Sequence, residues 1–220
     1  MNWVSTFLRS SIGRKIVMAV SGVMLFGFVL VHMIGNLQVY TGPTALDEYG
    51  KFLRSIGHGA GIWVARGGLL LAAIAHVWAA WSLTMDNRKA RPEGYRERQN
   101  RESTFSSRTM RWSGLVVLVF VIYHLLHFTT GTVHPNFVHG AVNQNFVIGL
   151  RVVWVAVFYM VANVLLGIHL FHGVWSMLQT LGVSHPRYDA LRKRAAAAFA
   201  AVIVIGNVSF PLAVLTGVVK

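Results

Sequence analysis

Histidines are the residues of this chain best placed for chemistry, because several lie inside segments apolar enough to cross a membrane. Six share this setting: His32, His76, His124, His127, His169 and His172. An ionisable side chain in a bilayer is tolerated mainly where it faces a bundle interior and has a partner, so a functional role is the first expectation. Imidazoles on four neighbouring helices suggest a bound cofactor, and haem is the most economical one.

The helices that must position these histidines can be read from the composition. Of 220 residues, 55% are hydrophobic and 12% are charged. A helix needs about 20 apolar residues to span the hydrocarbon core of a membrane. Five such runs predict an all-α polytopic membrane protein whose first four transmembrane helices form a haem-binding bundle. No repeat of fixed period is evident, so we expect one domain over residues 1–220, with spans at residues 16–39, 62–85, 112–130, 152–179 and 195–218.

The connecting segments are predicted to hold little regular structure. The first outer segment contains ALDEYGKFLRS, residues 45–55, which could form a surface helix. The second, HPNFVHGAVNQNF, residues 134–146, is predicted to be a loop. We therefore expect the histidines of these outer segments to have structural or solvated roles, except His58, which lies where an outer quinone pocket could form.

The basic residues indicate the topology. The formal net charge of +13 would suit a nucleic-acid partner, but fifteen of the twenty Lys and Arg residues fall on the side of the membrane that holds the N-terminus. The positive-inside rule then places the N-terminus in the cytoplasm and the C-terminus outside, with no nucleic acid involved. The polar stretch 86–111 is either a solvated loop or a docking surface for a soluble partner.

The absence of cysteine limits how a cofactor could be held. With no Cys in the chain, disulfides, thiolate-bound iron–sulfur clusters and covalent haem attachment are excluded. The depth of the histidines sorts them into two layers. With a rise of about 1.5 Å per residue, His76 and His169 lie roughly 12–15 Å from the cytoplasmic ends of their helices, and His32 and His124 roughly 18–24 Å. Two ligand pairs at two depths would hold two stacked haems that transfer electrons.

Depth alone does not choose between His124 and His127, or between His169 and His172. The residue left over in each case can bind a propionate, a quinone or a neighbouring carbonyl. Any single membrane histidine can also simply hydrogen-bond across a helix interface. Cationic candidates for the haem propionates lie near the helix ends, where snorkelling to the interface is the alternative role. They are Arg14, Lys15, Arg108 and Arg111 at the inner side, and Arg66 and Arg151 at the outer side. Quinone candidates are Tyr49, Arg54 and His58 outside and Ser10 inside.

Three stretches resemble the five-helix, two-haem cytochrome b membrane anchor of the succinate dehydrogenase and fumarate reductase family. They are SGVMLFGFVLVHMIGNL from Ser21, GKFLRSIGHGAGIWVARGGLLLAAIAHVWAA from Gly50, and IHLFHGVWSMLQTLGV from Ile168. In the family a glycine–hydrophobic–Trp–Ser run follows the fourth-span ligand and an aromatic residue precedes the third-span ligand. The resemblance therefore implies ligation by His169 and His124, so that His32 with His124 would hold the outer haem b and His76 with His169 the inner one.

The resemblance implies a subunit of succinate dehydrogenase in the inner membrane of a bacterium. Its partners would be a flavoprotein, an iron–sulfur protein and a quinone, commonly menaquinone, with a higher oligomer of the complex as a further option. Catalysis on the dicarboxylate would belong to the partners, not to this chain. Some fumarate-reducing relatives have a glutamate two residues before the fourth-span ligand, where this chain has Gly167. That departure favours succinate oxidation.

Three other interpretations remain open from the sequence. A two-haem cytochrome b of a hydrogenase or formate dehydrogenase would use the same paired histidines with a different catalytic partner. A metal-ion transporter could line its path with His32, His76, His124 and His169, although such transporters usually add carboxylates. A haem-poor anchor that binds only quinone is the third.

Overall fold

The computed structural model describes residues 2–90 and 105–220, with the backbone alone described for residues 105–108. The described residues are largely helical and contain no strand. Five of the helices are long and apolar enough to cross a membrane. They are α2 (Ser11–Asn36), α4 (Ala60–Lys89), α5 (Phe105–Phe128), α7 (Val153–Thr180) and α8 (Asp189–Leu215). The predicted all-α polytopic membrane fold is confirmed.

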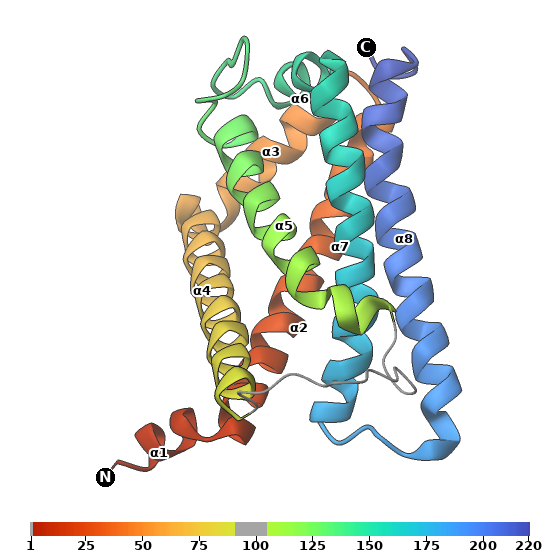
Figure 1. The fold of residues 1–220 in the computed structure, drawn as a ribbon. Helices are drawn as coiled ribbons and strands as arrows, with labels where there is room; N and C mark the ends of the chain where they lie inside the picture. The colour runs from red at the N-terminus through yellow and green to blue at the C-terminus, as the bar shows by residue number, and fades with distance from the viewer. Residues whose placement is uncertain (1, 91–104) are drawn as a thin grey trace.

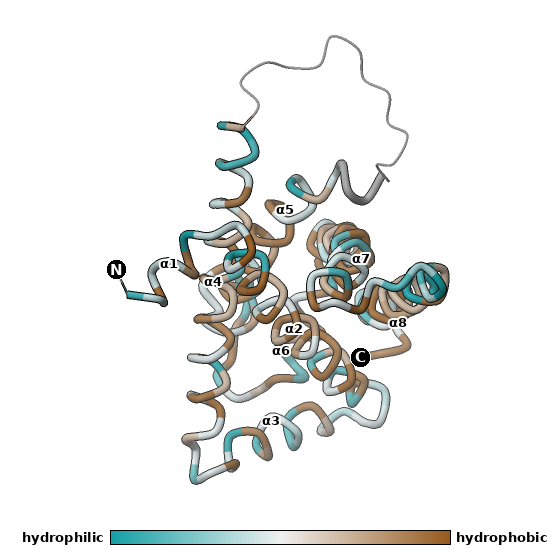
Figure 2. Tube along the Cα trace, turned by 90° about the horizontal axis from the view of Figure 1, so that it is seen from below, coloured by the Kyte–Doolittle hydropathy of each residue, from teal (hydrophilic) through white to brown (hydrophobic). Residues whose placement is uncertain are grey.

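The two termini lie at opposite ends of the bundle, as an odd number of crossings requires (Figure 1). Following the predicted topology, we call the end with the N-terminus the inner end and the opposite end the outer end. Hydrophobic residues cover the long helices, and hydrophilic residues gather at the inner end of α4 (Figure 2). Exposed tryptophans lie near both ends, with Trp81 and Trp112 towards the inner end and Trp63 and Trp154 towards the outer end. Such belts are typical of the two membrane–water interfaces.

Shorter elements connect the long helices. The chain enters through α1 (Trp3–Arg9), and α3 (Ala45–Ser55) and α6 (Val142–Arg151) lie at the outer end (Figure 1). Helix α3 has the bounds expected for the surface helix. The sequence-based expectation of a plain loop over residues 134–146 is wrong for its last residues, because α6 begins at Val142. Buried residues on one face of α6 stabilise this helix. Three 3₁₀ turns complete the described part of the chain: η1 (Leu37–Tyr40), η2 (Ile56–Gly59) and η3 (Pro186–Tyr188).

Helices α2, α4, α5 and α8 all begin earlier than the hydrophobic runs suggested, and the cause can be seen for α2 and α8. Helix α2 starts at Ser11 because the hydroxyl of Ser10 accepts a hydrogen bond from the backbone N–H of Gly13 at 2.9 Å and caps the helix. Helix α8 starts at Asp189, whose carboxylate in the first turn suits the positive end of the helix dipole. Polar residues therefore extend both helices beyond the apolar segment, towards the inner end.

The long helices associate mainly as pairs. Helix α2 packs on α4, and α5 packs on α7, which is covered on its other side by α8. Contacts between α2 and α7 join the pairs, whereas α4 hardly touches α5 within the described residues. Gly167 allows α7 and α8 to approach closely, since a Cβ atom there would collide with the side chain of Val204. The four helices α2, α4, α5 and α7 therefore surround the space into which the predicted ligands could point.

Candidate haem-binding sites

The first pair of histidines lies in the outer half of the bundle. The ring centroids of His32 on α2 and His124 on α5 are 5.8 Å apart, and the ring planes are inclined by 83°. Phe28, one turn before His32, stacks on it at 5.2 Å, and Phe120, one turn before His124, lies 5.9 Å from its ring. Each imidazole thus has a phenylalanine one turn before it on its own helix.

The second pair lies closer to the inner end. The ring centroids of His76 on α4 and His169 on α7 are 6.4 Å apart, with the planes inclined by 63°. Glycine faces each ring: a Cβ atom at Gly22 would lie 3.5 Å from Cε1 of His76, and one at Gly114 would lie 3.4 Å from Cε1 of His169. A Cβ atom at either glycine would therefore be in van der Waals contact with the imidazole.

Both separations suit one metal ion between two imidazole nitrogens. Bonds from a metal to a histidine nitrogen are about 2 Å long, and the distance from each nitrogen to its ring centre accounts for the remainder. The chemistry of the donors agrees, since imidazole nitrogens can serve as axial ligands of haem iron. These residues therefore fit haem b at both pairs, and that they bind it stays a prediction.

Serine hydroxyls contact the Nδ1 atoms of the inner pair, His76 and His169. Nδ1 of His76 lies 3.2 Å from the Oγ of Ser21 and 3.2 Å from the backbone oxygen of Met18. Nδ1 of His169 lies 3.4 Å from the Oγ of Ser113. A histidine that ligates a metal usually has its second ring nitrogen held in this way, which sets both tautomer and ring orientation. Nε2 is the nitrogen left for a metal in both residues.

The two helix pairs are copies of one arrangement. Residues 21–32 and 113–124 share a pattern of Ser-Gly, five residues, Phe, three residues and His. In each copy the serine contacts the histidine of the next long helix, and the terminal histidine faces its counterpart in the other copy. These two copies lie far apart in the sequence and do not form a repeat of fixed period, so they add to the sequence-based expectation and do not contradict it.

The outer pair has different partners. Nδ1 of His124 lies 3.4 Å from the hydroxyl of Tyr159 on α7, which also lies 3.0 Å from Nδ1 of His127. On the other side, Nε2 of His32 lies 3.3 Å from the amide nitrogen of Asn36. Asn36 would have to release that nitrogen if His32 were to ligate a metal through Nε2.

The structure places His127 and His172 away from the facing pairs. His127 is fully buried and stacks on His134, with the ring centroids 5.0 Å apart. His172 packs edge-on to Trp175 at 5.9 Å, and its Nδ1 is buried without a hydrogen-bond partner among the described residues. It is thus His124 that lies opposite His32, and His169 that lies opposite His76.

Comparison with known proteins shows the family. The model of the succinate dehydrogenase/fumarate reductase transmembrane subunit matches residues 87–208, more than half of the chain. The chain belongs to this family. It is therefore a multi-pass transmembrane subunit of succinate dehydrogenase or fumarate reductase complexes. No curated protein and no solved structure matches it.

The family match covers one side of each histidine pair. His124 and His169 lie within the matched residues of this transmembrane subunit, whereas His32 and His76 precede them. The fold places each matched histidine opposite an unmatched one. In each facing pair, one histidine therefore lies inside the matched residues and the other lies before them.

The cationic candidates for propionates occupy varied settings. Arg14 forms an ion pair with Asp86 at 2.7 Å, which joins the inner ends of α2 and α4. Arg66 lies 5.2 Å above the ring of Trp63, a cation–π contact at the outer end. The other described candidates are exposed: Lys15, Arg111 and Arg151. The side chain of Arg108 lies outside the described residues, as do the basic residues at 91–104.

The quinone candidates divide between the two ends of the transmembrane subunit. Tyr49 lines an open hollow of about 530 Å³ between η1 and α3. Arg54 and His58 are exposed and do not line it. The ring of Tyr49 packs on Gly35, one turn from His32, where a Cβ atom would lie 2.6 Å away. Ser10 lies at the inner end and caps α2. Tyr49 therefore connects the hollow with the segment of α2 that carries His32.

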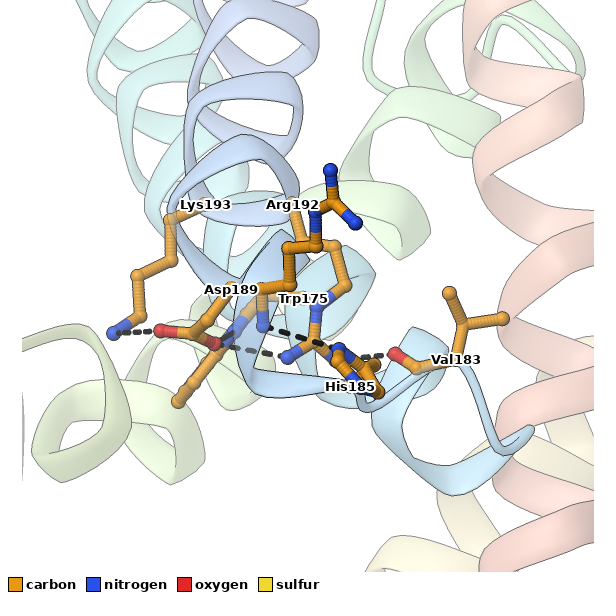
Figure 3. Close-up of polar contacts among 7 residues, drawn as sticks. Trp175, Val183, His185, Asp189, Arg192 and Lys193 are labelled. Atoms are coloured by element: carbon orange, nitrogen blue, oxygen red, sulfur yellow. Dashed lines mark hydrogen bonds and ion pairs between the residues drawn. The ribbon is translucent and has the colours of Figure 1, made fainter.

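Two structural features were missed from the sequence. Tyr159 reads as core in an apolar run, and only its placement beside two histidines reveals its polar role. At the inner end, the buried Arg192 holds the α7–α8 connection by bonding to the Asp189 carboxylate at 3.0 Å and to the backbone oxygen of Val183 (Figure 3). Trp175 and Lys193 also contact that carboxylate, at 3.4 and 2.8 Å. The burial of Arg192 could not be predicted from the sequence, because its neighbours there are also charged.

Proposed function

We propose that this chain is the cytochrome b membrane anchor of a succinate:quinone oxidoreductase, of the type with five helices and two haems in one subunit. It would pass electrons from an iron–sulfur subunit on the cytoplasmic face to a quinone, in the inner membrane of a bacterium. The observation that carries the proposal is the presence of two facing imidazole pairs at two depths, at 5.8 and 6.4 Å.

The ligands follow from the pairs. His32 and His124 would hold the outer haem b, and His76 and His169 the inner one. Haem held by two imidazoles supplies one-electron transfer and leaves no open position for oxygen or substrate. Ser21 and Ser113 would orient the inner ligands through their Nδ1 atoms.

Docking and quinone binding would occur at opposite ends. The basic residues at the inner end provide the surface for the iron–sulfur subunit, which itself binds the flavoprotein that oxidises succinate. The hollow of about 530 Å³ beside Tyr49 is the better supported quinone site, because the ring of Tyr49 packs on Gly35, three residues after His32. We take menaquinone as the quinone by resemblance to the two-haem members of the family.

Succinate oxidation is the proposed direction. The fourth transmembrane helix has Gly167 where some fumarate-reducing relatives have glutamate, and this glycine is buried against α8. A carboxyl side chain there would meet Val204, so the position serves helix packing. The hydrogenase or formate dehydrogenase cytochrome and the metal-ion transporter have no specific observation in their favour.

The deciding experiment is an optical spectrum of the purified complex, reduced minus oxidised, with haem counted by pyridine haemochrome. We expect two b-type haems per chain. His76→Ala and His169→Ala should each remove one haem, and His32→Ala and His124→Ala should each remove the other. His139→Ala, which changes an exposed outer histidine, is the control and should keep both.

Two results would contradict the proposal. A colourless complex that still contains the flavoprotein and iron–sulfur subunits would leave an anchor without haem. Retention of both haems in all four ligand variants would contradict the assignment of these histidines as ligands.

A further inference from the structure

A tyrosine hydroxyl links one outer ligand to a histidine that no role described so far accounts for. The hydroxyl of Tyr159 lies between Nδ1 of His124, at 3.4 Å, and Nδ1 of His127, at 3.0 Å. Tyr159 and His127 are buried side chains, with exposed fractions of 6% and 0%. Buried polar groups cost free energy unless they are paired. The contact of Tyr159 with both histidines is therefore a specific feature of the structure.

The number of donors decides which atom donates and which accepts in the hydrogen bonds of His124, Tyr159 and His127. A neutral imidazole has one donor and one acceptor nitrogen. If Nε2 of His124 binds a metal, its Nδ1 carries the proton and donates to the Tyr159 oxygen. The single O–H of Tyr159 is then free to donate to Nδ1 of His127. The three groups can therefore donate and accept in one consistent order. The proton of His127 then lies on its Nε2, which is buried without a hydrogen-bond partner among the described residues.

The surroundings of His127 keep it in place. His134 stacks on it and is itself fixed, since its Nε2 lies 2.8 Å from the backbone oxygen of Asn145 and its Nδ1 accepts from the N–H of Asn136 at 3.1 Å. On the α6 side, a Cβ atom at Gly149 would lie 2.7 Å from Cε1 of His127. His127 therefore has little freedom to turn away from Tyr159.

We propose that Tyr159, backed by His127, is a positioning residue that orients His124 and lowers the midpoint potential of the outer haem. The inference rests on the proposed function. A hydroxyl that accepts the Nδ1–H of a ligating histidine makes the ligand more basic, which favours the oxidised metal. The bond from Tyr159 to His127 strengthens this acceptor, because hydrogen bonds in a chain polarise one another. The inner pair uses serines for the equivalent contact, so the two sites differ in this element.

The test is a potentiometric titration of the purified complex that carries Tyr159→Phe, with ferric EPR spectra of the same samples. The component that is missing from the His32→Ala complex identifies the outer haem. Mutation of a residue that hydrogen-bonds to a metal ligand typically changes metal affinity or activity by about tenfold or more. A tenfold change in the one-electron equilibrium corresponds to about 59 mV, and we expect the outer component to rise by about that amount. Its EPR signal should move as well, and the inner component should stay in place.

The matched control is Tyr123→Phe. Tyr123 lies 6.2 Å from the ring of Tyr159 and stacks on His127 at 5.4 Å, but no hydrogen bond joins its hydroxyl to a histidine within the described residues. Its removal should leave both potentials unchanged. If Tyr159→Phe loses the outer haem, the second variant is His127→Leu, which removes the acceptor and should raise the same component by a smaller amount.

The outcomes separate the two proposals. Two haems whose potentials are the same in wild type, Tyr159→Phe and His127→Leu would overturn the positioning role and leave the haem anchor intact. An equal shift of both components, or an equal shift with Tyr123→Phe, would also overturn it. A wild-type complex without haem would overturn the proposed function and this inference together.

Discussion

Ser21 and His76 lie 55 residues apart in the chain, and the fold brings the Oγ of one to 3.2 Å from Nδ1 of the other. Ser113 and His169 repeat the contact at 3.4 Å. We expect Ser21→Ala and Ser113→Ala to weaken retention of the inner haem by roughly tenfold, since removal of a partner of a ligating histidine has this typical effect. Haem retained after dilution or gel filtration measures it.

The control for the serine substitutions is Ser82→Ala on α4, which changes a serine without such a contact and should retain haem as the wild type does. Equal losses from Ser82→Ala and Ser21→Ala would argue that the hydroxyl behind His76 plays no part.

Substitutions within one histidine pair should not add. His32 and His124 face each other at 5.8 Å, so each alanine variant should remove the whole outer site. The double variant His32→Ala/His124→Ala should then retain the same single haem as either parent, because the two residues act as a unit. By contrast, His32→Ala combined with His76→Ala should lose both haems. The pyridine haemochrome assay distinguishes these cases.

Gly167→Ala should lower the stability of the protein. Alanine is favoured over glycine in a helix by about 1 kcal/mol. The added methyl group would meet Val204, however, and overpacking typically costs about 1–3 kcal/mol. We therefore expect a net loss, seen as a lower melting temperature in detergent. Gly68→Ala on α4 has open space around the new methyl group and should raise the melting temperature instead. A rise in both variants would contradict the close approach of α7 and α8.

Arg192→Ala should destabilise the inner end of the α7–α8 pair. The guanidinium bonds to the Val183 backbone oxygen and to Asp189, and both partners would lose a charged donor. Arg194→Ala is the matched control, because Arg194 is an exposed cation two residues further along. We expect the melting temperature to fall by several degrees for Arg192→Ala and to stay close to the wild-type value for Arg194→Ala. The same fall in both would indicate a general effect of charge.

Succinate–menaquinone activity in membranes should fall when an uncoupler collapses the membrane potential. If quinone is reduced near the outer pair, negative charge moves outward across an inside-negative potential, which contributes about 2.3 kcal/mol per 100 mV for a full crossing. Activity of the complex with a soluble dye, which accepts electrons before the membrane subunit, is the control and should not respond. Unchanged quinone activity would place quinone reduction at the inner end.

Much of the architecture follows from the sequence. The five spans, the surface helix α3 and the separation of the histidines into two layers depend on apolar run length and helical rise, which are local properties. The exact helix starts were not predicted, because Ser10 and Asp189 stabilise turns that lie outside the hydrophobic runs. Helix α6 was missed for a related reason, since its buried face exists only where other helices cover it.

The residues that could ligate a haem were therefore identified by the sequence, whereas their partners were decided by tertiary structure. His124 and His127 are one turn apart on the same helix, and no local rule decides which of them faces His32. The fold decides it, because α7 brings Tyr159 between the two and α6 encloses His127. Hydrogen bonds such as those of Ser21 and Tyr159 join different helices, so their existence depends on how the helices pack and not on the residues around either partner.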